Sequence, residues 1–472
     1  MFVVRAMLFY FPSKKIENQG FFYGGRKMNE NKMGNKAVFP LLMSMAFPPM
    51  LSMLVQSLYN IVDSIYVAQI SENAITAVSL SFPIQNLVLA VAVGTGIGMN
   101  SYIARKLGQK EVNEANSAVA HGLLLMILSS VVFAVAAFFV LDPFFKYFSD
   151  SAEIISMGKD YLIIILLFSF GSLIHIAIEK VFQACGQMVA PMIFQAVGCV
   201  VNIVLDPIFI FVFKMGVQGA AIATVIGQLV SMGLSIYWLK YRKIDVHLDI
   251  KNFHFNWNCI KQIYAVGVPS MCMTAISSAL VVGLNSLLIK FSNMAVSLFG
   301  IYFKLQTFVL MPVSGLTQGA LPIFAYNYGA GNRQRLVETL KIALIVAFFI
   351  NLAGTLIFFI FPNFLLSMFA VSDEMLLMGN TALKIMSFCY IPATLGMMLP
   401  TLFQAMGKGF YSFIIYLTRQ FILTFPLAYI LSSTPLGIHG IWIALPASEV
   451  LAALLALLFY AHVHRQDPIF KS

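Results

Sequence analysis

Residues 117–140 read SAVAHGLLLMILSSVVFAVAAFFV, a long stretch without a single Asp, Glu, Lys or Arg. An α-helix rises about 1.5 Å per residue, so about 20 apolar residues cross a hydrocarbon core of roughly 30 Å. Residues 337–362 and other charge-poor stretches bring the number of such segments to about twelve. The apolar runs are continuous and lack the alternation of an outer-membrane β-barrel. The sequence therefore predicts an all-α integral membrane protein.

The overall composition indicates the same class of protein. Hydrophobic residues make up 60% of the 472 residues and charged residues only 10%, where a soluble domain carries roughly 25% charged residues. The net charge of +10 does not indicate a nucleic-acid partner, because the basic residues are dispersed over short loops. We expect the lipid bilayer to surround the chain and no nucleic acid to bind it.

The basic residues instead predict the orientation in the membrane, because cytoplasmic loops carry an excess of Lys and Arg. With the N-terminus in the cytoplasm, most of the loop cations lie inside: Arg105, Lys106, Lys110, Lys240, Arg242, Lys243, Lys251, Lys261, Arg333, Arg335 and Lys341. The alternate loops carry only Lys146, Lys159, Lys214 and Lys290. An even number of spans then places both termini in the cytoplasm.

The start of the chain raises a separate question. The membrane pattern begins only near Ala37, and Met28 and Met33 precede it. A purine-rich ribosome-binding sequence could encode the stretch 24–27 (GGRK), so we hypothesise that translation starts at Met28 rather than Met1. Peptides from residues 1–27 in the native protein, found by mass spectrometry, would refute this hypothesis.

The chain contains an internal repeat. The stretch 182–186 (FQACG) reappears as 403–407 (FQAMG), and 403 minus 182 is 221. The stretch 216–219 (GVQG) reappears as 437–440 (GIHG) at the same shift. Further residues match at 221: Phe82 and Phe303, Gln85 and Gln306, Gly94 and Gly315, Gly98 and Gly319, Ala104 and Ala325, and Gly108 and Gly329. Because the shift spans about six helices, the two halves have the same orientation, related by a pseudo-twofold axis along the membrane normal.

This repeat predicts two six-helix bundles around a central cavity. We expect the shared glycines to serve helix packing. The predicted segments are a cytoplasmic N-terminal segment at 1–36, a first lobe at 37–241, a cytoplasmic linker at 242–258, a second lobe at 259–463 and a cytoplasmic tail at 464–472.

Polar residues that the repeat does not share are the candidates for function. A carboxylate inside lipid is costly, and the first half places Asp63 and Asp206 within spans. At the shift of 221, Asp63 corresponds to Leu284 and Asp206 to Leu427. Two further polar residues also correspond to leucines at this shift: Asn202 to Leu423, and Thr224 to Leu445. The sequence therefore predicts a buried carboxylate site in the first half alone.

The residue types at this site suit two chemistries. Asn202 and Asp206 are four residues apart, so they share one helix face, and Pro207 leaves the carbonyl of Ile203 without its amide partner. Such oxygens could hold a proton, because burial disfavours a charged carboxylate, or bind a hard cation such as Na⁺. A purely structural role, in which both aspartates cap or pin helices, is the alternative.

Other intramembrane polar residues carry weaker hypotheses. We expect Glu179 and Lys180 to form a self-satisfied pair rather than a proton relay. Lys304, Lys384 and Arg419 could neutralise the acidic residues within the membrane spans. The residues expected to line a substrate cavity are Gln56, Asn60, Gln85, Asn285, Gln306 and Glu449.

Several motifs in order resemble the multidrug and toxic compound extrusion (MATE) transporters. They are LYNIVDSIYV at 58–67, FQACGQMVAP at 182–191, NIVLDPIFIF at 202–211, GVQGAAIAT at 216–224 and PVSGLTQGALPIFAYNYGAGN at 312–332. The resemblance covers about residues 37–463, and its detail is similar to the DinF-like and MepA-like bacterial branch.

The resemblance implies a secondary active exporter of cationic dyes, biocides and antibiotics, driven by inward flow of H⁺ or Na⁺. It places the cation site of the DinF-like type on Asp63, Asn202, Asp206 and Thr224. The second-lobe acids of NorM-like members are missing, because 259–290 and 380–405 contain no Asp or Glu. It further implies a monomer in the bacterial cytoplasmic membrane, without a cofactor.

Three rival functions fit the sequence less well. A lipid-linked oligosaccharide flippase of the same superfamily would be expected to show a cationic cavity, whereas the sharpest membrane charges here are acidic. An intramembrane enzyme needs a nucleophile with a base or a metal motif such as HExxH, and neither occurs in the sequence. An ion channel is disfavoured by the lack of a filter-like repeat.

Overall fold

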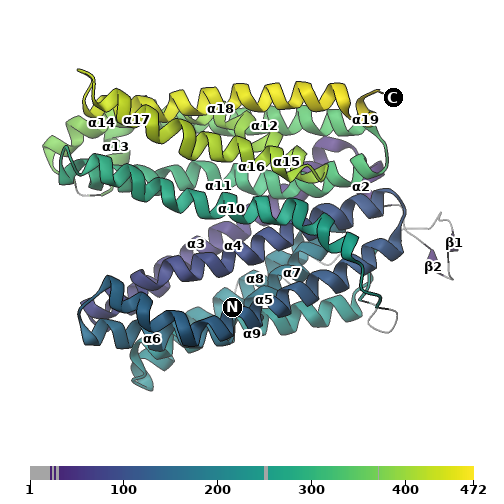
Figure 1. Ribbon diagram of the computed structural model, residues 1–472, viewed down its shortest axis with the longest axis horizontal. Coiled ribbons are helices and arrows are strands. Elements are labelled where there is room, and N and C mark those ends of the chain that lie inside the picture. Colours follow the sequence, from purple (N-terminus) through teal and green to yellow (C-terminus); the bar gives the residue numbers. More distant parts are fainter. Residues whose placement is uncertain (1–21, 24–25, 28–30, 249–252, 370, 472) are drawn as a thin grey trace.

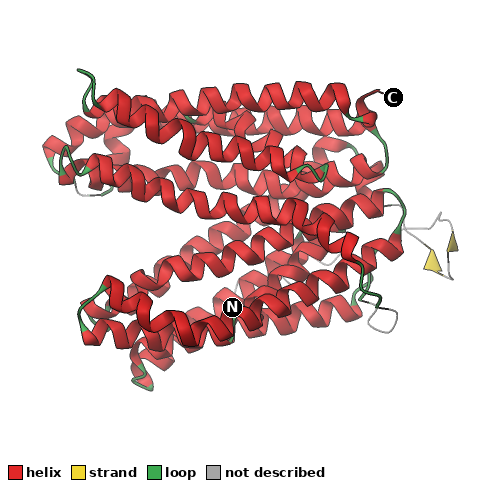
Figure 2. Cartoon of the chain, in the orientation of Figure 1, coloured by secondary structure: helices red, strands yellow, loops and turns green. Residues whose placement is uncertain are grey.

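The computed structural model describes residues 22–23, 26–27, 31–248, 253–369 and 371–471. Within these ranges the chain is almost entirely helical, apart from short loops and one small hairpin (Figure 2). The helices form two bundles that lie against each other (Figure 1). The predicted all-α membrane fold is confirmed. Met28 lies outside the described residues, so the hypothetical start there stays a prediction.

The first lobe contains the helices that precede the linker. They are α3 (Val38–Ala68), α4 (Glu72–Gly108), α5 (Val112–Phe148), α6 (Ala152–Leu167), α7 (Phe170–Ala184), α8 (Val189–Pro207) and α9 (Gly216–Tyr241). A π-helical turn, η1 (Ile208–Val212), continues α8.

The second lobe contains the helices that follow the linker. They are α10 (Trp257–Leu288), α11 (Asn293–Gly329), α12 (Arg333–Ile360), α13 (Pro362–Ser367), α14 (Asp373–Ser387), α15 (Tyr390–Ala405), α16 (Gly409–Leu417), α17 (Thr424–Ser432) and α18 (Ile438–Gln466). The π-helical turn η2 (Thr418–Leu423) joins α16 to α17.

The remaining elements are short. The helix α2 (Lys32–Asn35) precedes the first lobe, and α19 (Pro468–Lys471) follows the second. The strands β1 (Phe22–Tyr23) and β2 (Arg26–Lys27) pair antiparallel.

The described residues supply enough long apolar helices for the predicted number of spans. Ten helical segments can cross a membrane, and the bent pairs α6–α7 and α14–α15 raise the number to twelve if each pair counts as one span. The two pairs bend by 46° and 43°. The internal repeat therefore extends to the breaks within helices.

The repeat is also visible in how the second helix of each lobe begins. The Ser71 hydroxyl group accepts a hydrogen bond from the Ala74 amide at 3.0 Å and caps α4. The Ser292 hydroxyl group accepts from the Ala295 amide at 3.0 Å and caps α11. Both serines satisfy an amide that the first helical turn leaves without a partner. The capping pair lies at the shift of 221, since 292 minus 71 is 221.

The first helix of each lobe packs against the second helix of the other lobe. Thus α3 lies along α11, and α10 lies along α4. A Cβ atom added at Gly98 would collide with the carbonyl oxygen of Ile263, and one at Gly319 would lie 2.7 Å from the amide nitrogen of Ala46. These shared glycines therefore allow close approach between the lobes, which is the packing role expected of them.

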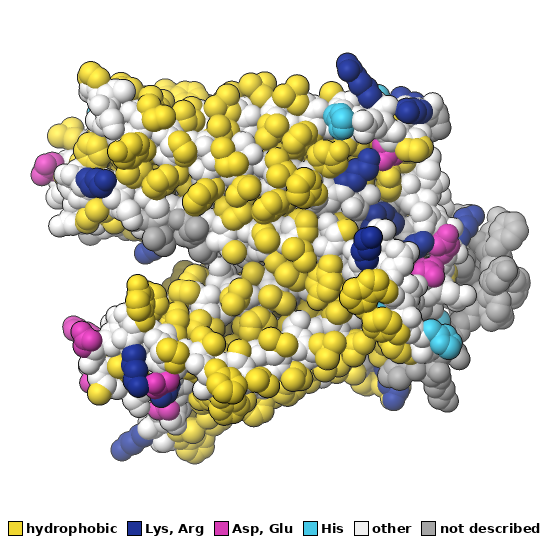
Figure 3. Space-filling model, viewed as in Figure 1, with side chains coloured by type: hydrophobic (Ala, Val, Ile, Leu, Met, Phe, Trp, Pro, Cys, Tyr) yellow, Lys and Arg dark blue, Asp and Glu magenta, His cyan; other side chains and the backbone are white. Residues whose placement is uncertain are grey.

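The lobes meet at the end of the molecule that carries α2, α19 and the linker, here called the linker end. A Cβ atom at Gly108 would collide with the carbonyl oxygen of Tyr326, and one at Gly329 would collide with that of Arg105. At the opposite end the space-filling view shows a wide cleft between the lobes (Figure 3). The molecule is therefore closed at the linker end and open at the other.

Hydrogen bonds fasten the linker end. The Ser101 hydroxyl group of α4 donates to the carbonyl oxygen of Gln404 in α15 at 2.6 Å. The N-terminal segment is tied to the second lobe through Met33, whose carbonyl oxygen accepts from Asn327 at 3.2 Å and from Arg335 at 2.9 Å. Opening this end would require the bond between Ser101 and Gln404, which runs between the lobes, to break.

The linker contacts the same N-terminal segment. The Asn31 side-chain amide donates to the Asp245 carboxylate at 2.6 Å. Burial raises the pKa of the Asp245 carboxyl group above its usual range, while the hydrogen bond from Asn31 and the charge of Lys32 act in the opposite direction. This pairing makes the lead-in to α3 part of the closed end.

Candidate functional site

Three helices of the first lobe bring the four predicted cation-site residues together. The Asn202 side-chain amide of α8 donates to the Asp206 carboxylate at 3.3 Å and to the Thr224 hydroxyl group of α9 at 3.2 Å. The Asp63 carboxyl group of α3 lies close enough to that of Asp206 to interact with it. Residues separated by up to 161 positions, since 224 minus 63 is 161, thus form one polar cluster.

The local sequence of α8 explains this arrangement. Asn202 and Asp206 lie one helical turn apart, and each is almost completely buried. Pro207 ends the regular helix, and the chain continues as the π-helical turn η1. Gly227 lets α9 approach closely, because a Cβ atom there would lie 2.7 Å from the carbonyl oxygen of Gly198.

The cluster contains oxygen atoms that have no hydrogen-bond donor among the described residues. These atoms are Oδ1 of Asp63, Oδ1 of Asn202 and Oδ2 of Asp206, and all three are shielded from solvent. An unpaired buried acceptor costs about 1–3 kcal/mol. Carbonyl and carboxylate oxygens suit a proton or a hard monovalent cation, so this donor set fits both candidate coupling ions.

Two tyrosines complete the cluster and were not predicted from the sequence. The Tyr59 side chain interacts with Asp63 and with the Thr224 hydroxyl group. The buried Tyr161 side chain of α6 interacts with both aspartates and with Gln85. Tyr59 lies four residues before Asp63, and helical spacing could have identified it. Nothing in the local sequence connects Tyr161 to the site.

A cavity of about 440 Å³ lies beside this cluster, mostly within the first lobe. Asn202 and Thr224 contribute to its wall, as does Gln56, a predicted cavity residue. Other amide side chains line it: Asn100, Gln183, Gln195, Gln228, Gln318 and Gln404. The cation-site residues and the cavity therefore share a boundary.

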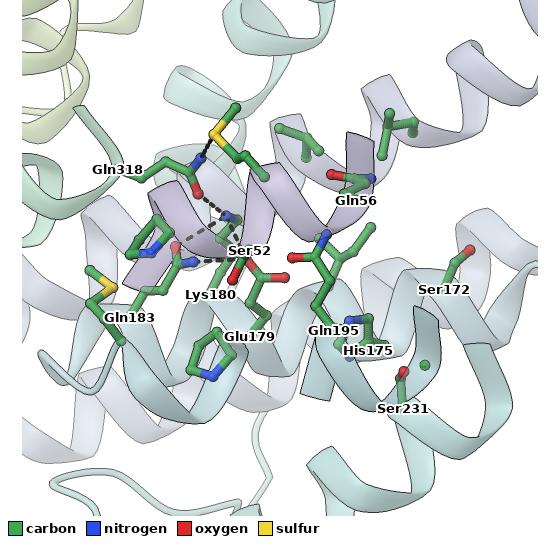
Figure 4. Close-up of a pocket in the computed structure, with 18 of the residues that line it drawn as sticks. Ser52, Gln56, Ser172, His175, Glu179, Lys180, Gln183, Gln195, Ser231 and Gln318 are labelled. Carbon is green, nitrogen blue, oxygen red and sulfur yellow. Dashed lines mark hydrogen bonds and ion pairs between the residues drawn. The ribbon is translucent and has the colours of Figure 1, made fainter. Parts of the chain in front are cut away.

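Glu179 and Lys180 lie in the wall of this cavity and form the expected ion pair. The Lys180 ammonium group lies 3.0 Å from the Glu179 carboxylate and donates to Gln183 at 3.0 Å (Figure 4). The same ammonium group reaches Gln318 of α11 at 3.5 Å, and Gln183 donates to Glu179 at 2.7 Å. Lys180 thus links the cavity wall of the first lobe to the second lobe.

The other predicted cavity residues lie away from this cavity. Asn60 is exposed on α3, and Gln85 interacts with Tyr161. Asn285 and Gln306 are half-buried in the second lobe, and Glu449 forms an ion pair with Arg419. Of the six predicted residues, only Gln56 lines the cavity among the described residues.

The second lobe holds aliphatic residues where the first lobe holds the cluster. Leu284 is fully buried in a hydrophobic core, and Leu427 and Leu445 pack against the same core. Leu423, the counterpart of Asn202, is half-buried. The contrast predicted from the repeat is therefore present in the packing of the side chains.

Comparisons with known proteins identify matches over most of the chain. The MatE family profile matches residues 48–208 and again 269–430. The two matches begin 221 residues apart, since 269 minus 48 is 221. The internal repeat found in the sequence thus corresponds to two copies of the same family unit.

Curated relatives of similar length include transport proteins. The "Multidrug export protein MepA" of Staphylococcus haemolyticus is 23% identical over 422 residues, which cover 89% of this chain and 93% of the relative. The MepA protein of Staphylococcus aureus is 24% identical over 423 residues with the same coverage. A "FAD transporter" of Shewanella oneidensis is 26% identical and covers 88% of this chain and 92% of the relative.

Solved structures share the whole architecture. A structure described as the outward-facing conformation of a multidrug resistance MATE family transporter of the MOP superfamily superposes with a TM-score of 0.89 at 26% identity. That match covers 95% of this chain and 100% of the other. A MOP superfamily transporter from Pyrococcus furiosus superposes with a TM-score of 0.86 at 26% identity, covering 93% and 98% of the two chains.

Proposed function

Because the chain belongs to the MatE family and is a membrane transporter rather than an enzyme, we propose that it exports cationic amphiphilic small molecules in exchange for H⁺ or Na⁺. The proposed coupling site consists of Asp63, Asn202, Asp206 and Thr224. The cargo is proposed to occupy the adjoining cavity and the cleft between the lobes.

The unpaired buried oxygens of the coupling site carry this proposal. A closed hydrophobic core would not retain two neighbouring carboxyl groups with unpaired oxygens, because their burial and mutual repulsion both cost free energy. A proton or a sodium ion relieves both costs. Binding at this site is therefore expected to stabilise the arrangement of α3, α8 and α9 seen here.

The position of α3 connects the site to the contact between the lobes. This helix carries Asp63, and it also packs along α11 of the second lobe. Pro48 and Pro49 lie within α3 and remove backbone hydrogen bonds, which permits bending. Binding of the ion and binding of the cargo are coupled if they favour different positions of α3.

The acidic character of the site supports a cationic cargo. No salt bridge involves Asp63 or Asp206 among the described residues, so the acidic groups beside the cavity have no built-in countercharge. Curated relatives are named multidrug export proteins, which supports small-molecule drugs and dyes as cargo.

The distribution of basic residues supports an orientation in the membrane. Lys and Arg side chains gather at the linker end, with fewer at the open end (Figure 3). The positive-inside rule then places the linker end and both termini in the cytoplasm of a bacterial cell. In this orientation the cleft faces outward. We propose that the transporter works as a monomer, since each chain contains both lobes.

Ethidium efflux tests the proposal. Everted vesicles that contain the protein are energised separately by a proton gradient and by a sodium gradient. We expect one gradient to drive ethidium transport, and the Asp206→Asn variant to lose it while remaining folded. The Asp150→Asn variant is the control, because Asp150 is exposed at the end of α5. Wild-type ethidium transport by Asp206→Asn would reject the coupling site.

A further inference from the structure

The second lobe contains a buried ion pair in the interior of its membrane helices. The Arg419 guanidinium group of η2 lies 3.5 Å from the Glu449 carboxylate of α18, and the two side chains are only 11% and 15% exposed. The ring of Tyr416 lies below the guanidinium group at 4.7 Å. Both charges are costly in a membrane interior unless each neutralises the other.

The backbone around Arg419 forms a π-helical turn in place of a regular α-helix. The π-helical turn η2 spans Thr418–Leu423, whereas the equivalent residues 197–202 of the first lobe are α-helical, since 418 minus 221 is 197. The Thr424 hydroxyl group donates to the carbonyl oxygen of Arg419 at 2.6 Å and lies 2.6 Å from the Ser448 hydroxyl group. The side chain of Thr424 thus satisfies a carbonyl group of the widened turn. Such π-helical turns are frequent at functional positions.

The ion pair occupies the second-lobe counterpart of the cavity. At the shift of 221, Arg419 corresponds to Gly198 and Glu449 corresponds to Gln228, and both first-lobe residues line the cavity. His175, another cavity residue, corresponds to Gly396.

Gly396 makes room for the pair. A Cβ atom added at Gly396 would lie 3.5 Å from Nη1 of Arg419 and 3.7 Å from Oε2 of Glu449. Any side chain longer than alanine would therefore meet the charged groups. In the first lobe, His175, Gly198 and Gln228 lie around an open cavity. In the second lobe, Gly396, Arg419 and Glu449 fill the equivalent space.

We propose that Arg419 acts as a tethered cation that permanently neutralises Glu449, so that the second lobe binds no coupling ion. This inference rests on the proposed function, because it explains why coupling would be confined to the first lobe. Arginine stays protonated in proteins, so a proton or a sodium ion would have to displace a covalently attached competitor from Glu449. Arg419 is therefore a positioning residue: it acts through Glu449 and thereby determines which lobe binds the coupling ion.

The groups around Glu449 support this role. Among the described residues, Arg419 is the cation that faces it, Cys389 and Tyr302 are the neighbouring titratable side chains, and Tyr416 contacts Arg419. These three neighbours are neutral in their ordinary protonation states at pH 7. Removal of Arg419 would thus leave a buried carboxylate that resembles the aspartates of the first lobe.

The number of ions exchanged for each cargo molecule tests the proposal. Wild-type protein and variants are reconstituted in liposomes, and the steady-state ethidium concentration ratio is measured against the imposed gradient of the ion that drives the wild type. The slope of the logarithms gives the coupling ratio. We expect Glu449→Gln and the double variant Arg419→Gln/Glu449→Gln to keep the wild-type slope. We expect Arg419→Gln alone to increase the slope by about one ion per ethidium, and Arg419→Lys to restore it.

Two outcomes would overturn the proposal. A lower slope in folded Glu449→Gln would make Glu449 a coupling carboxylate, and an Arg419→Gln slope equal to that of the wild type would leave the pair a packing feature. If Arg419→Gln does not fold, the Glu449→Gln slope decides alone. Failure of the proposed function is distinguishable, because it would appear as gradient-driven transport that survives Asp206→Asn.

Discussion

In the first lobe, α8 and α9 bring Asn202, Asp206 and Thr224 together, whereas the equivalent helices of the second lobe bring leucines together. The backbone plans of the two lobes match down to the serine caps and the bent helix pairs. Packing at the contact between the lobes is therefore shared, while the polar chemistry of each interior is not. The duplicated scaffold therefore accommodates two different buried polar arrangements. The first lobe has two carboxyl groups without a cation, and the second lobe has a carboxylate paired with an arginine, although each arrangement keeps a carboxylate oxygen without a hydrogen-bond partner among the described residues.

Converting the first lobe to the residues of the second should have the largest effect. We expect the double substitution Asn202→Leu/Asp206→Leu to reduce gradient-driven ethidium transport to the level of vesicles without the protein. The same variant should be more stable by about 1–3 kcal/mol, because unpaired buried oxygens are removed. Transport assays and thermal melting of the purified protein measure both effects. A less stable variant would indicate that the cluster serves mainly to hold the helices together.

The reverse substitution probes the core of the second lobe. Leu427→Asp places a half-buried carboxylate against a hydrophobic core, without the Asn and Thr partners of the first lobe. We expect a loss of about 3–5 kcal/mol in stability, since the buried charge has no compensation. Leu427→Met is the matched control and should cost less than about 1.5 kcal/mol. Equal melting temperatures for the two variants would show that the second lobe tolerates a carboxylate as readily as the first.

The glycines at the contact between the lobes test the shared part of the scaffold. Gly98→Ala and Gly319→Ala should each destabilise the closed linker end by about 1–3 kcal/mol, because the added methyl group collides with backbone of the other lobe. Gly233→Ala is the control, since nothing lies within 4 Å of the added atom. Crosslinking between cysteines introduced across the linker end measures closure. Unequal losses of stability in the two variants would show that the two contacts between the lobes are not equivalent.

The smallest expected effect concerns pH and the lead-in segment of the first lobe. The pKa of Asp245 is raised by burial, so the folded protein binds a proton more tightly than the unfolded chain does. The free energy of unfolding should therefore increase as the pH falls through the raised pKa toward the usual value of about 4. This gain in stability should be lost above the raised pKa.

The Asp245→Asn variant isolates this effect, because it is neutral at every pH. We expect the melting temperature of the wild type to lie below that of the variant at pH 8 and to approach it as the pH falls. Parallel melting curves over this range would contradict the assignment to Asp245. Asp150→Asn, an exposed aspartate, should show no such difference.

Most of the fold follows from the sequence because hydropathy and the repeat are local or additive signals. The composition of residues 117–140 specifies a membrane helix whatever its neighbours are, and the lipid cost identifies Asp63 and Asp206. The pairing of Tyr161 with the aspartates depends on how α6 packs, which no local pattern records. Of the predicted cavity residues only Gln56 lines the cavity beside the cluster among the described residues, because a polar residue in a span can face either bundle interior.

The ion pair of the second lobe is a second contact that no local sequence pattern predicts. Arg419 and Glu449 are 30 residues apart, since 449 minus 419 is 30, and they meet because η2 packs against α18. The sequence suggested both residues as separate candidates. Their partnership, and the glycine that makes room for it, required the structure.

If ion coupling resides in the first lobe alone, the double variant Asp63→Asn/Asp206→Asn should lose it completely. The variant keeps the second lobe intact. In proteoliposomes with an imposed gradient of the coupling ion, ethidium and ion fluxes are measured together. We expect ethidium still to equilibrate down its own gradient but no longer to move uphill, and no ion flux to accompany it. Uphill ethidium transport with an accompanying ion flux would show that coupling does not depend on the first lobe.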